Sequence, residues 1–203
     1  MSYKSELQSV IKMYKRNLEG TIQQINQARD SGSYTPQGLN SFVESINETF
    51  SSAADQNRES ALKIVRKAED AFKSENQRIV VGNLKDAGFQ MGLLNAVNAL
   101  KHNEVSEEDF KCIVEAFKED SFAINRVKEA LKESQNGAAY VGMLPYTYED
   151  QVELFTKLKA NAVKYIRSVT VGNNSGAQMG IQWLLDSIEA LSDDLLLPSD
   201  RIA

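Results

Sequence analysis

The apolar residues of the first 80 positions recur three and four apart, in two runs separated by a single break. The first run extends from about Tyr3 to Asp30. Its apolar seam comprises Leu7, Ile11, Tyr14, Leu18, Thr21, Ile25 and Ala28. This heptad-like spacing predicts an α-helix that packs along one side against another helix. Because Tyr14 and Thr21 are imperfect seam residues, the run does not predict a strong isolated zipper.

The break, Ser31 to Gly38, predicts a tight turn followed by a second helix. Thr35 can cap the free N–H groups of that helix, and Pro36 has the backbone φ that suits the first helical position. The apolar face that follows weakens over a polar stretch and then resumes. Its members are Leu39, Phe42, Val43, Ile46, Phe50, Ala53, Ala54, Ala61, Ile64, Val65, Ala68 and Phe72. We therefore expect a coiled-coil-like helical hairpin over residues 1–80.

The second predicted helix is longer than the first, so part of its apolar face lacks a partner within the hairpin. If it continues from Pro36 to about Ile79, it is roughly 65 Å long at ~1.5 Å per residue. The excess must overhang the first helix, cover another segment or meet another subunit. From this mismatch we predict a homo-oligomer. The expected self-association residues are Leu39, Phe42, Ile46, Phe50, Ile64, Val65 and Phe72.

Shorter helical patterns over residues 81–137 predict a small helical bundle. Gly88 and Gly92 are four apart and would share a helix face, which indicates close helix packing; no phosphate-loop pattern surrounds them. Neighbouring apolar residues are expected in the core, namely Met91, Leu94, Val97, Ala99 and Leu100. Ser106 begins S-E-E-D, which is close to a capping box at a helix start.

Residues 138–203 are expected to form C-terminal helices that pack on this bundle. The apolar segment Ala138 to Tyr146 is either a connection packed on the core or an exposed docking segment. Near the chain end, Leu195, Leu196 and Leu197 are predicted to dock on a partner, because apolar residues outside clear helical stripes often mark contact sites. Packing on their own bundle is the alternative. The fold class is therefore all-α, with a long N-terminal helical hairpin followed by a compact helical bundle.

The charge of the chain argues against a nucleic-acid partner. The formal net charge is −5, of which residues 1–80 carry a net +1 and residues 81–203 a net −6. No stretch of about 18 apolar residues predicts a membrane span, and the N-terminus has no apolar signal-peptide core. The single cysteine, Cys112, excludes an intramolecular disulfide. We therefore expect a protein of a reducing cytoplasm.

No residue pattern predicts catalysis, a cofactor or a metal site. His102 is the only histidine, and a capping or surface role near a helix end suffices to explain it. Cys112 lies in an acidic segment, which disfavours a reactive thiolate. The acidic pairs Glu107/Glu108 and Glu149/Asp150 lie at predicted helix starts, where negative charge stabilises the helix dipole. We therefore expect a protein that is not an enzyme.

Two stretches resemble a known group of proteins. They are the hairpin broken at Tyr34-Thr35-Pro36-Gln37-Gly38 and the segment from Leu93 to Leu131. Together they resemble helical proteins encoded in the structural-gene modules of tailed phages and prophages of Gram-positive bacteria. The resemblance implies a head-associated role as scaffold, capsid-associated or decoration protein, with other virion proteins as partners. The host cytoplasm or the virion is then the expected location.

The resemblance supplies no functional residues and leaves a second hypothesis open. The chain would then be a cytosolic, phage-encoded interaction or inhibitor module that binds a host protein. Stoichiometry discriminates between the two hypotheses. A structural protein is present in particles in many copies, whereas an inhibitor forms a small defined complex.

Overall fold

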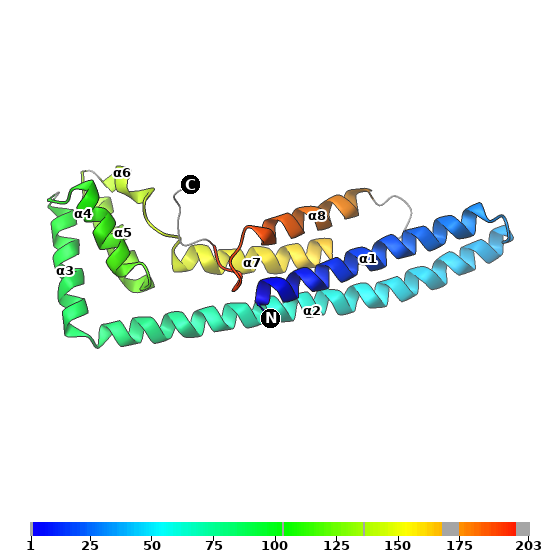
Figure 1. Cartoon of the computed structure of the whole chain (residues 1–203), viewed down its shortest axis with the longest axis horizontal. Helices are drawn as coiled ribbons and strands as arrows, with labels where there is room; N and C mark the ends of the chain where they lie inside the picture. Colours follow the sequence, from blue (N-terminus) through cyan, green and yellow to red (C-terminus); the bar gives the residue numbers. More distant parts are fainter. Residues whose placement is uncertain (1, 103, 136, 168–174, 198–203) are drawn as a thin grey trace. The chain divides into compact units, whose positions relative to one another are not determined.

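The computed structural model describes residues 2–102, 104–135, 137–167 and 175–197, and every regular element in these ranges is a helix (Figure 1). The helices are α1 (Tyr3–Asp30), α2 (Pro36–Leu84), α3 (Ala87–Lys101), α4 (Glu107–Phe117), α5 (Ser121–Glu133), α6 (Gly137–Val141), α7 (Tyr148–Tyr165) and α8 (Ser175–Glu189). The predicted all-α fold, with a long N-terminal hairpin followed by a compact bundle, is confirmed.

The chain forms two compact units, and two of the three boundaries between them fall inside helices. Unit 1 comprises Met1–Ala68 and Leu154–Leu196, and unit 2 comprises Glu69–Glu153 and Leu197–Ala203. Two of the three boundaries therefore lie within α2 and α7, and the third lies between Leu196 and Leu197, after α8. This division differs from the expected segments 1–80, 81–137 and 138–203, because most of the C-terminal part belongs with the hairpin. The expectation that the C-terminal helices pack on the small bundle is corrected accordingly.

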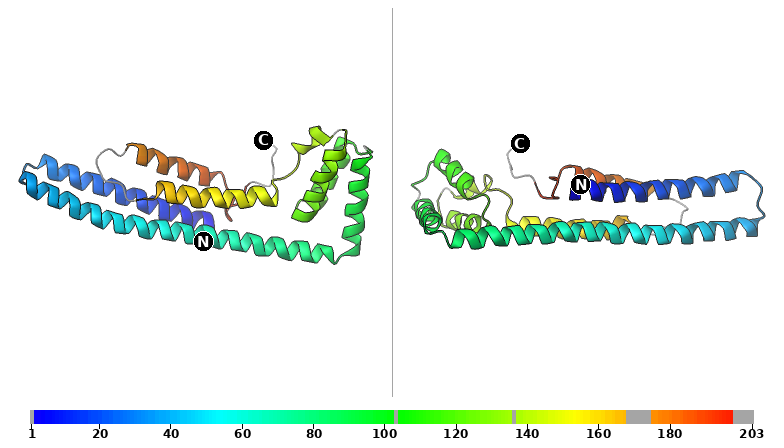
Figure 2. Two further views of the ribbon diagram at one scale, coloured as in Figure 1. Left: turned by 180° about the vertical axis from the view of Figure 1, so that it is seen from behind. Right: turned by 60° about the horizontal axis from the view of Figure 1, so that its bottom comes forward.

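In unit 1, the helices α1, α2, α7 and α8 run side by side with alternating direction (Figures 1 and 2). The Tyr14 ring on α1 packs against the Phe50 ring on α2, with centroids 5.8 Å apart. The Tyr14 hydroxyl donates a hydrogen bond to the carbonyl oxygen of Arg167, just beyond α7, at 2.7 Å. The buried core includes Leu7, Ile11, Leu18, Ala54, Ala61, Ile64, Val65, Ala68, Phe155, Leu158, Ile166, Ile181, Leu184 and Ile188. Amphipathic faces from each of the helices thus meet in one core.

The turn between α1 and α2 follows the local signals of the sequence. Gly32 has a φ of 61°, in the left-handed region that glycine adopts without steric cost. The Thr35 hydroxyl accepts a hydrogen bond from the Gly38 backbone N–H at 3.1 Å, so the predicted cap is confirmed. Pro36 is the first residue of α2.

Unit 2 has its own hydrophobic core, formed by α3, α4, α5, α6 and the segment that follows α6. Its buried members are Leu93, Ala96, Leu100, Phe110, Phe117, Ala123, Ile124, Val127, Ala130, Leu131 and Leu144. Ser106 and Asp109 form the predicted capping box of α4. Asp120 caps α5 by accepting from the Ala123 N–H at 2.8 Å, and it also accepts from the Asn83 side-chain amide at 2.9 Å. In unit 2, the helix caps and the apolar helix faces therefore favour the same arrangement of helices.

The segment Ala138 to Tyr146 packs on the core of unit 2. The Tyr140 ring stacks on the Phe110 ring with centroids 4.6 Å apart, and Leu144 is buried. Of the two alternatives that the sequence left open, the connection packed on the core is the one found. An exposed docking segment would instead present the side chains of Tyr140 and Leu144 to solvent.

Candidate interaction surface at the tip of the hairpin

The apolar face of α2 changes from buried to half-buried along one continuous helix. We define the hairpin tip as residues 21–46, which comprise the end of α1, the turn and the start of α2. In the tip, Leu39, Phe42, Val43 and Ile46 are all half-buried, whereas Phe50 is only 3% exposed. Among the described residues, no other helix lies along the tip, because α7 and α8 both end before it (Figures 1 and 2).

The apolar side chains of α2 in the tip are only half-buried because a pair of helices cannot enclose an apolar stripe of this width. On α1, the seam residues Ile25 and Ala28 are buried. On α2, the apolar residues follow the spacing i, i+3, i+4, i+7, which gives a stripe about 100° wide or more. One facing helix covers only part of such a stripe. Elsewhere in unit 1, α7 and α8 complete the enclosure.

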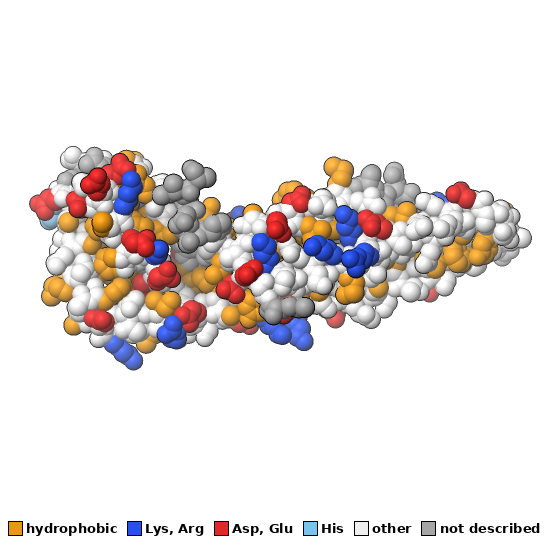
Figure 3. All heavy atoms as spheres, in the orientation of Figure 1, with side chains coloured by type: hydrophobic (Ala, Val, Ile, Leu, Met, Phe, Trp, Pro, Cys, Tyr) orange, Lys and Arg blue, Asp and Glu red, His pale blue; other side chains and the backbone are white. Residues whose placement is uncertain are grey.

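Charged side chains are sparse in the tip. Only Arg29, Asp30 and Glu44 are charged among these 26 residues, although 25% of the whole chain is charged. Figure 3 shows hydrophobic atoms amid uncharged surface at this end of the hairpin. Because like charges are nearly absent, two copies of the tip would approach each other with little electrostatic repulsion. The surface is suited to contact with protein.

The predicted self-association residues divide into three groups. Leu39, Phe42 and Ile46 lie in the tip and remain partly exposed. Phe50, Ile64 and Val65 are buried in the core of unit 1. Phe72 is half-buried in unit 2, where its ring stacks on the Tyr148 ring at 5.4 Å.

The part of the apolar face of α2 that α1 does not cover is therefore packed within the chain, since Ile64 and Val65 are buried and Phe72 is half-buried. The excess length of α2 consequently does not require another subunit. In the structure, α7 lies along the part of α2 that extends past the start of α1 (Figures 1 and 2). Of the three alternatives for this excess length, covering by another segment of the chain is the one found.

The predicted docking residues at the end of the chain also pack on the protein itself. Leu195 is fully buried, so the expectation that it is exposed for docking is wrong. Leu196 and Leu197 are half-buried. The Leu197 N–H donates to the Gln151 side-chain oxygen at 3.0 Å within unit 2.

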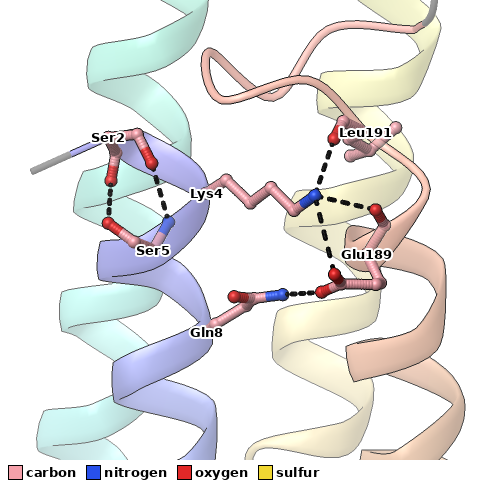
Figure 4. Close-up of polar contacts among 6 residues, drawn as sticks. All are labelled: Ser2, Lys4, Ser5, Gln8, Glu189 and Leu191. Atoms are coloured by element: carbon pink, nitrogen blue, oxygen red, sulfur yellow. Dashed lines mark hydrogen bonds and ion pairs between the residues drawn. The ribbon is translucent and has the colours of Figure 1, made fainter.

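A polar contact between α1 and α8 holds the chain just before these residues. The Lys4 ammonium donates to the carbonyl oxygens of Glu189 and Leu191 at 2.8 and 3.0 Å, and the Gln8 amide donates to the Glu189 carboxylate (Figure 4). A cation at this place satisfies carbonyl groups that the end of a helix leaves free. The first residues of the chain thus fasten the end of α8.

The residues considered for chemistry do not converge on a site. His102 is exposed and caps the C-terminus of α3, and Cys112 is exposed on α4. Glu107 forms an ion pair with Lys111 at 2.7 Å on the surface of α4. Within the described ranges, no group of three or more potential ligand side chains could hold a metal ion. None of the described helices is long and apolar enough to cross a bilayer.

A second exposed apolar surface escaped sequence reasoning. Met91 and Leu94 were expected in the core, but they are 59% and 53% exposed on α3. The core of unit 2 takes up the opposite face of this helix, through Leu93, Ala96 and Leu100. A signal was present, since α3 is apolar on two faces and one small core can cover only one of them.

Comparisons of the chain with protein-family models, with curated proteins and with solved structures found no match. No relative therefore carries a residue role, a substrate or a partner over to this chain. Its function must be inferred from its own surfaces.

Proposed function

We propose that this chain is a non-enzymatic assembly protein that associates with a second copy of itself through the hairpin tip. The single observation that carries the proposal is the change from the buried Phe50 to the half-buried Ile46, Val43, Phe42 and Leu39 on one helix. Two further helices enclose the same apolar face elsewhere in unit 1. A second hairpin tip would supply two such helices and complete a bundle of the same kind.

The expected strength of this contact is modest. Full burial of a Leu, Ile, Val or Phe side chain contributes about 1.5–3 kcal/mol, so burying the part of each that is still exposed, about a third at most, contributes about 1 kcal/mol at most. Four residues on each of two copies therefore supply about 8 kcal/mol at most. Association itself costs about 4–15 kcal/mol in lost freedom. We expect a pair that forms and dissociates with concentration.

The virion setting is part of the proposal and is supported by the resemblance to phage structural-module proteins. In that setting the chain is head-associated, as a scaffold, capsid-associated or decoration protein, and its further partners are virion subunits. Mass spectrometry of purified particles tests this. Many copies per particle are expected, and a small complex with a host protein in place of particles would favour the interaction-module alternative.

Sedimentation velocity over a range of concentrations tests the self-association. In one variant, Phe42→Gln is combined with Ile46→Gln to remove the apolar strip. In a second, Ser41→Arg with Ser45→Arg adds like charges beside the strip at two exposed positions, which leaves the hairpin seam intact. The matched control is Val163→Gln, which changes a 52% exposed residue of α7.

Both tip variants should lose the concentration-dependent increase in mass, and the control should keep it. Melting curves of the arginine variant distinguish loss of association from loss of folding. A wild-type chain that remains a monomer at the highest concentration would refute the proposal. So would an arginine variant that associates as the wild type does.

A further inference from the structure

Two stretches of unit 1 carry positive charges only. Residues 7–18 on α1 contain three Lys or Arg residues and no acidic residue. Residues 154–167 and 175–185, on α7 and α8, contain four such cations and again no acidic residue. Counted along the sequence, the acidic residues between the two stretches outweigh them. The fold, however, places α1, α7 and α8 side by side, so the two stretches adjoin (Figures 1 and 2).

Specific contacts bring the cations of the two stretches together. The Lys15 ammonium on α1 donates a hydrogen bond to the side-chain oxygen of Gln182 on α8 at 3.1 Å. The Tyr14 hydroxyl, one residue earlier, donates to the carbonyl oxygen of Arg167, just beyond α7, at 2.7 Å. Figure 3 shows Lys and Arg side chains gathered over the part of unit 1 where α1, α7 and α8 meet. A cationic surface therefore forms there.

An aromatic pair lies beside these cations. Trp183 follows Gln182 on α8 and is 53% exposed, and its ring centroid lies 5.7 Å from that of Tyr165 on α7. The Lys164 ammonium lies 5.0 Å from the centroid of the Tyr165 ring. Gly180 leaves room for this ring, because an added Cβ would lie 2.4 Å from its Cδ1 atom. The pair is thus held in place and still open to a ligand.

We define the cationic aromatic surface by the side chains of Lys12, Lys15, Arg16, Lys164, Tyr165, Arg167 and Trp183. Two carboxylates lie close to it, Glu19 on α1 and Asp186 on α8, and Asp186 accepts from the Gln182 amide at 2.8 Å. Five cations and two carboxylates leave a net charge of +3. Lys12 and Arg16 are exposed and take part in none of the ion pairs among the described residues. They are available to an anionic ligand.

The combination of cations with exposed aromatic rings favours one class of anionic ligand. An acidic protein segment would use the cations but bring no flat faces for the rings. Duplex DNA keeps its bases stacked inside the helix. A single strand offers both phosphates and unstacked bases, which bind to cationic surfaces that carry aromatic side chains. We propose that the cationic aromatic surface binds single-stranded nucleic acid without sequence preference.

In this complex, one base stacks on the exposed face of Trp183, and neighbouring phosphates contact Lys164 and the cations of α1. The affinity is modest, about 1–100 μM at physiological salt, as is typical of nonspecific binding. The surface shares no residue with the hairpin tip, so this binding does not depend on pairing of the tips.

Intrinsic fluorescence reports directly on this surface, because Trp183 is the only tryptophan of the chain. Titrating the full-length protein with an oligothymidylate of about 12 nucleotides should quench this fluorescence as a base stacks on the ring. Polyglutamate and a DNA duplex of similar length should bind more weakly and quench less. Equal binding and quenching by either would show that stacking of unpaired bases is not what the surface recognises, and would overturn the proposal. Absence of binding to the oligothymidylate would overturn it too.

Variants at the aromatic pair test the stacking, with the anisotropy of a labelled oligothymidylate as the readout. Trp183→Ala should weaken binding roughly 5- to 150-fold, the usual loss for one stacked base. Trp183→Phe keeps an aromatic face and should restore most of the affinity. Circular dichroism and melting curves check that both variants fold. Equal affinities of the alanine variant and the wild type would contradict the proposal.

Salt dependence tests the phosphate contacts. With about three phosphates bound, raising the salt from about 50 to about 200 mM should weaken wild-type binding roughly 20-fold. Combining Lys12→Gln with Arg16→Gln removes two contacts and should reduce this factor to about threefold. The matched control, Lys63→Gln with Lys67→Gln, removes two exposed cations of α2 and should keep the wild-type factor. Equal effects of the two double variants would show that only net charge matters and would refute a site on this surface.

Discussion

Tyr34 and Phe42 lie with ring centroids 5.3 Å apart at the end of the hairpin, yet Tyr34 remains 45% exposed and Phe42 is only half-buried. The aromatic pair further along the same hairpin, Tyr14 and Phe50, has a similar centroid distance of 5.8 Å but is buried. The difference arises from the surroundings, because α7 and α8 flank the second pair and not the first. The same hairpin is thus part of a closed core at one end and an open surface at the other.

Replacing either of two glycines of unit 2 by alanine should change the stability of the protein, but in opposite directions. At Gly137 an added Cβ would lie 1.8 Å from the Leu131 carbonyl oxygen, which is backbone and cannot move aside easily. At Gly82, inside α2, nothing lies within 4 Å. Gly137→Ala should lower stability by about 1–3 kcal/mol, as overpacking does. Gly82→Ala should raise it by about 0.5–1 kcal/mol through helix propensity.

Urea unfolding followed by circular dichroism measures both changes. Gly20→Ala in α1 provides a further control, since its added Cβ also meets nothing within 4 Å. A neutral effect of Gly137→Ala would contradict the packing of α6 against the end of α5.

The leucines near the end of the chain should contribute unequally to stability. Leu195 is fully buried, with a φ of 61°, and it is held by a hydrogen bond from its N–H to the Ser192 carbonyl at 3.0 Å. Leu195→Ser should therefore lower stability by about 2–4 kcal/mol, because it empties a core position. Leu196→Ser, at a half-buried position, should cost about 1 kcal/mol or less. Similar melting temperatures for the two variants would show that Leu195 is not part of the core.

Tyr14 should make stability fall at alkaline pH. Burial raises the pKa of its hydroxyl above 10.0, and the backbone hydrogen bond with Arg167 partly opposes this. The contribution is complete below the unfolded pKa near 10 and is lost as pH rises through the higher folded pKa, because the unfolded chain ionises first.

Tyr14→Phe tests this dependence. It should cost about 1 kcal/mol at neutral pH through the lost hydrogen bond. Between roughly pH 9 and 11, its stability should then decline less steeply than that of the wild type. Urea titrations at each pH give the free energy of unfolding of the two proteins. If the two free energies decline in parallel over this pH range, Tyr14 does not have this role.

Local patterns in the sequence predicted the helices well. The seam residues Leu7, Ile11 and Leu18 are buried as expected, and the caps at Thr35 and Ser106 form. These features depend on residues within a few positions of one another, so periodicity and capping chemistry suffice to find them.

Packing between distant segments was not predictable in the same way. The excess length of α2 could be covered by any apolar helix, and periodicity does not say which. Leu195 takes up a left-handed backbone conformation that an L-amino acid rarely adopts, so only its surroundings explain it. Met91 looked like a core residue because α3 is apolar on two faces, and only the structure shows which face the core of unit 2 uses.

Pulsed electron paramagnetic resonance between spin labels on two copies tests the central claim, pairing through the hairpin tip, most directly. The chain carries Cys112→Ser and one labelled cysteine, either Asn40→Cys in the tip or Glu59→Cys on the same helix, both at exposed positions. The two sites are about 28 Å apart along α2. Pairing through the tips predicts a defined distance between copies for the label at residue 40, and a much longer distance or none for the label at residue 59. A short distance at residue 59, or no interaction between copies at residue 40 when the concentration is raised, would contradict the account.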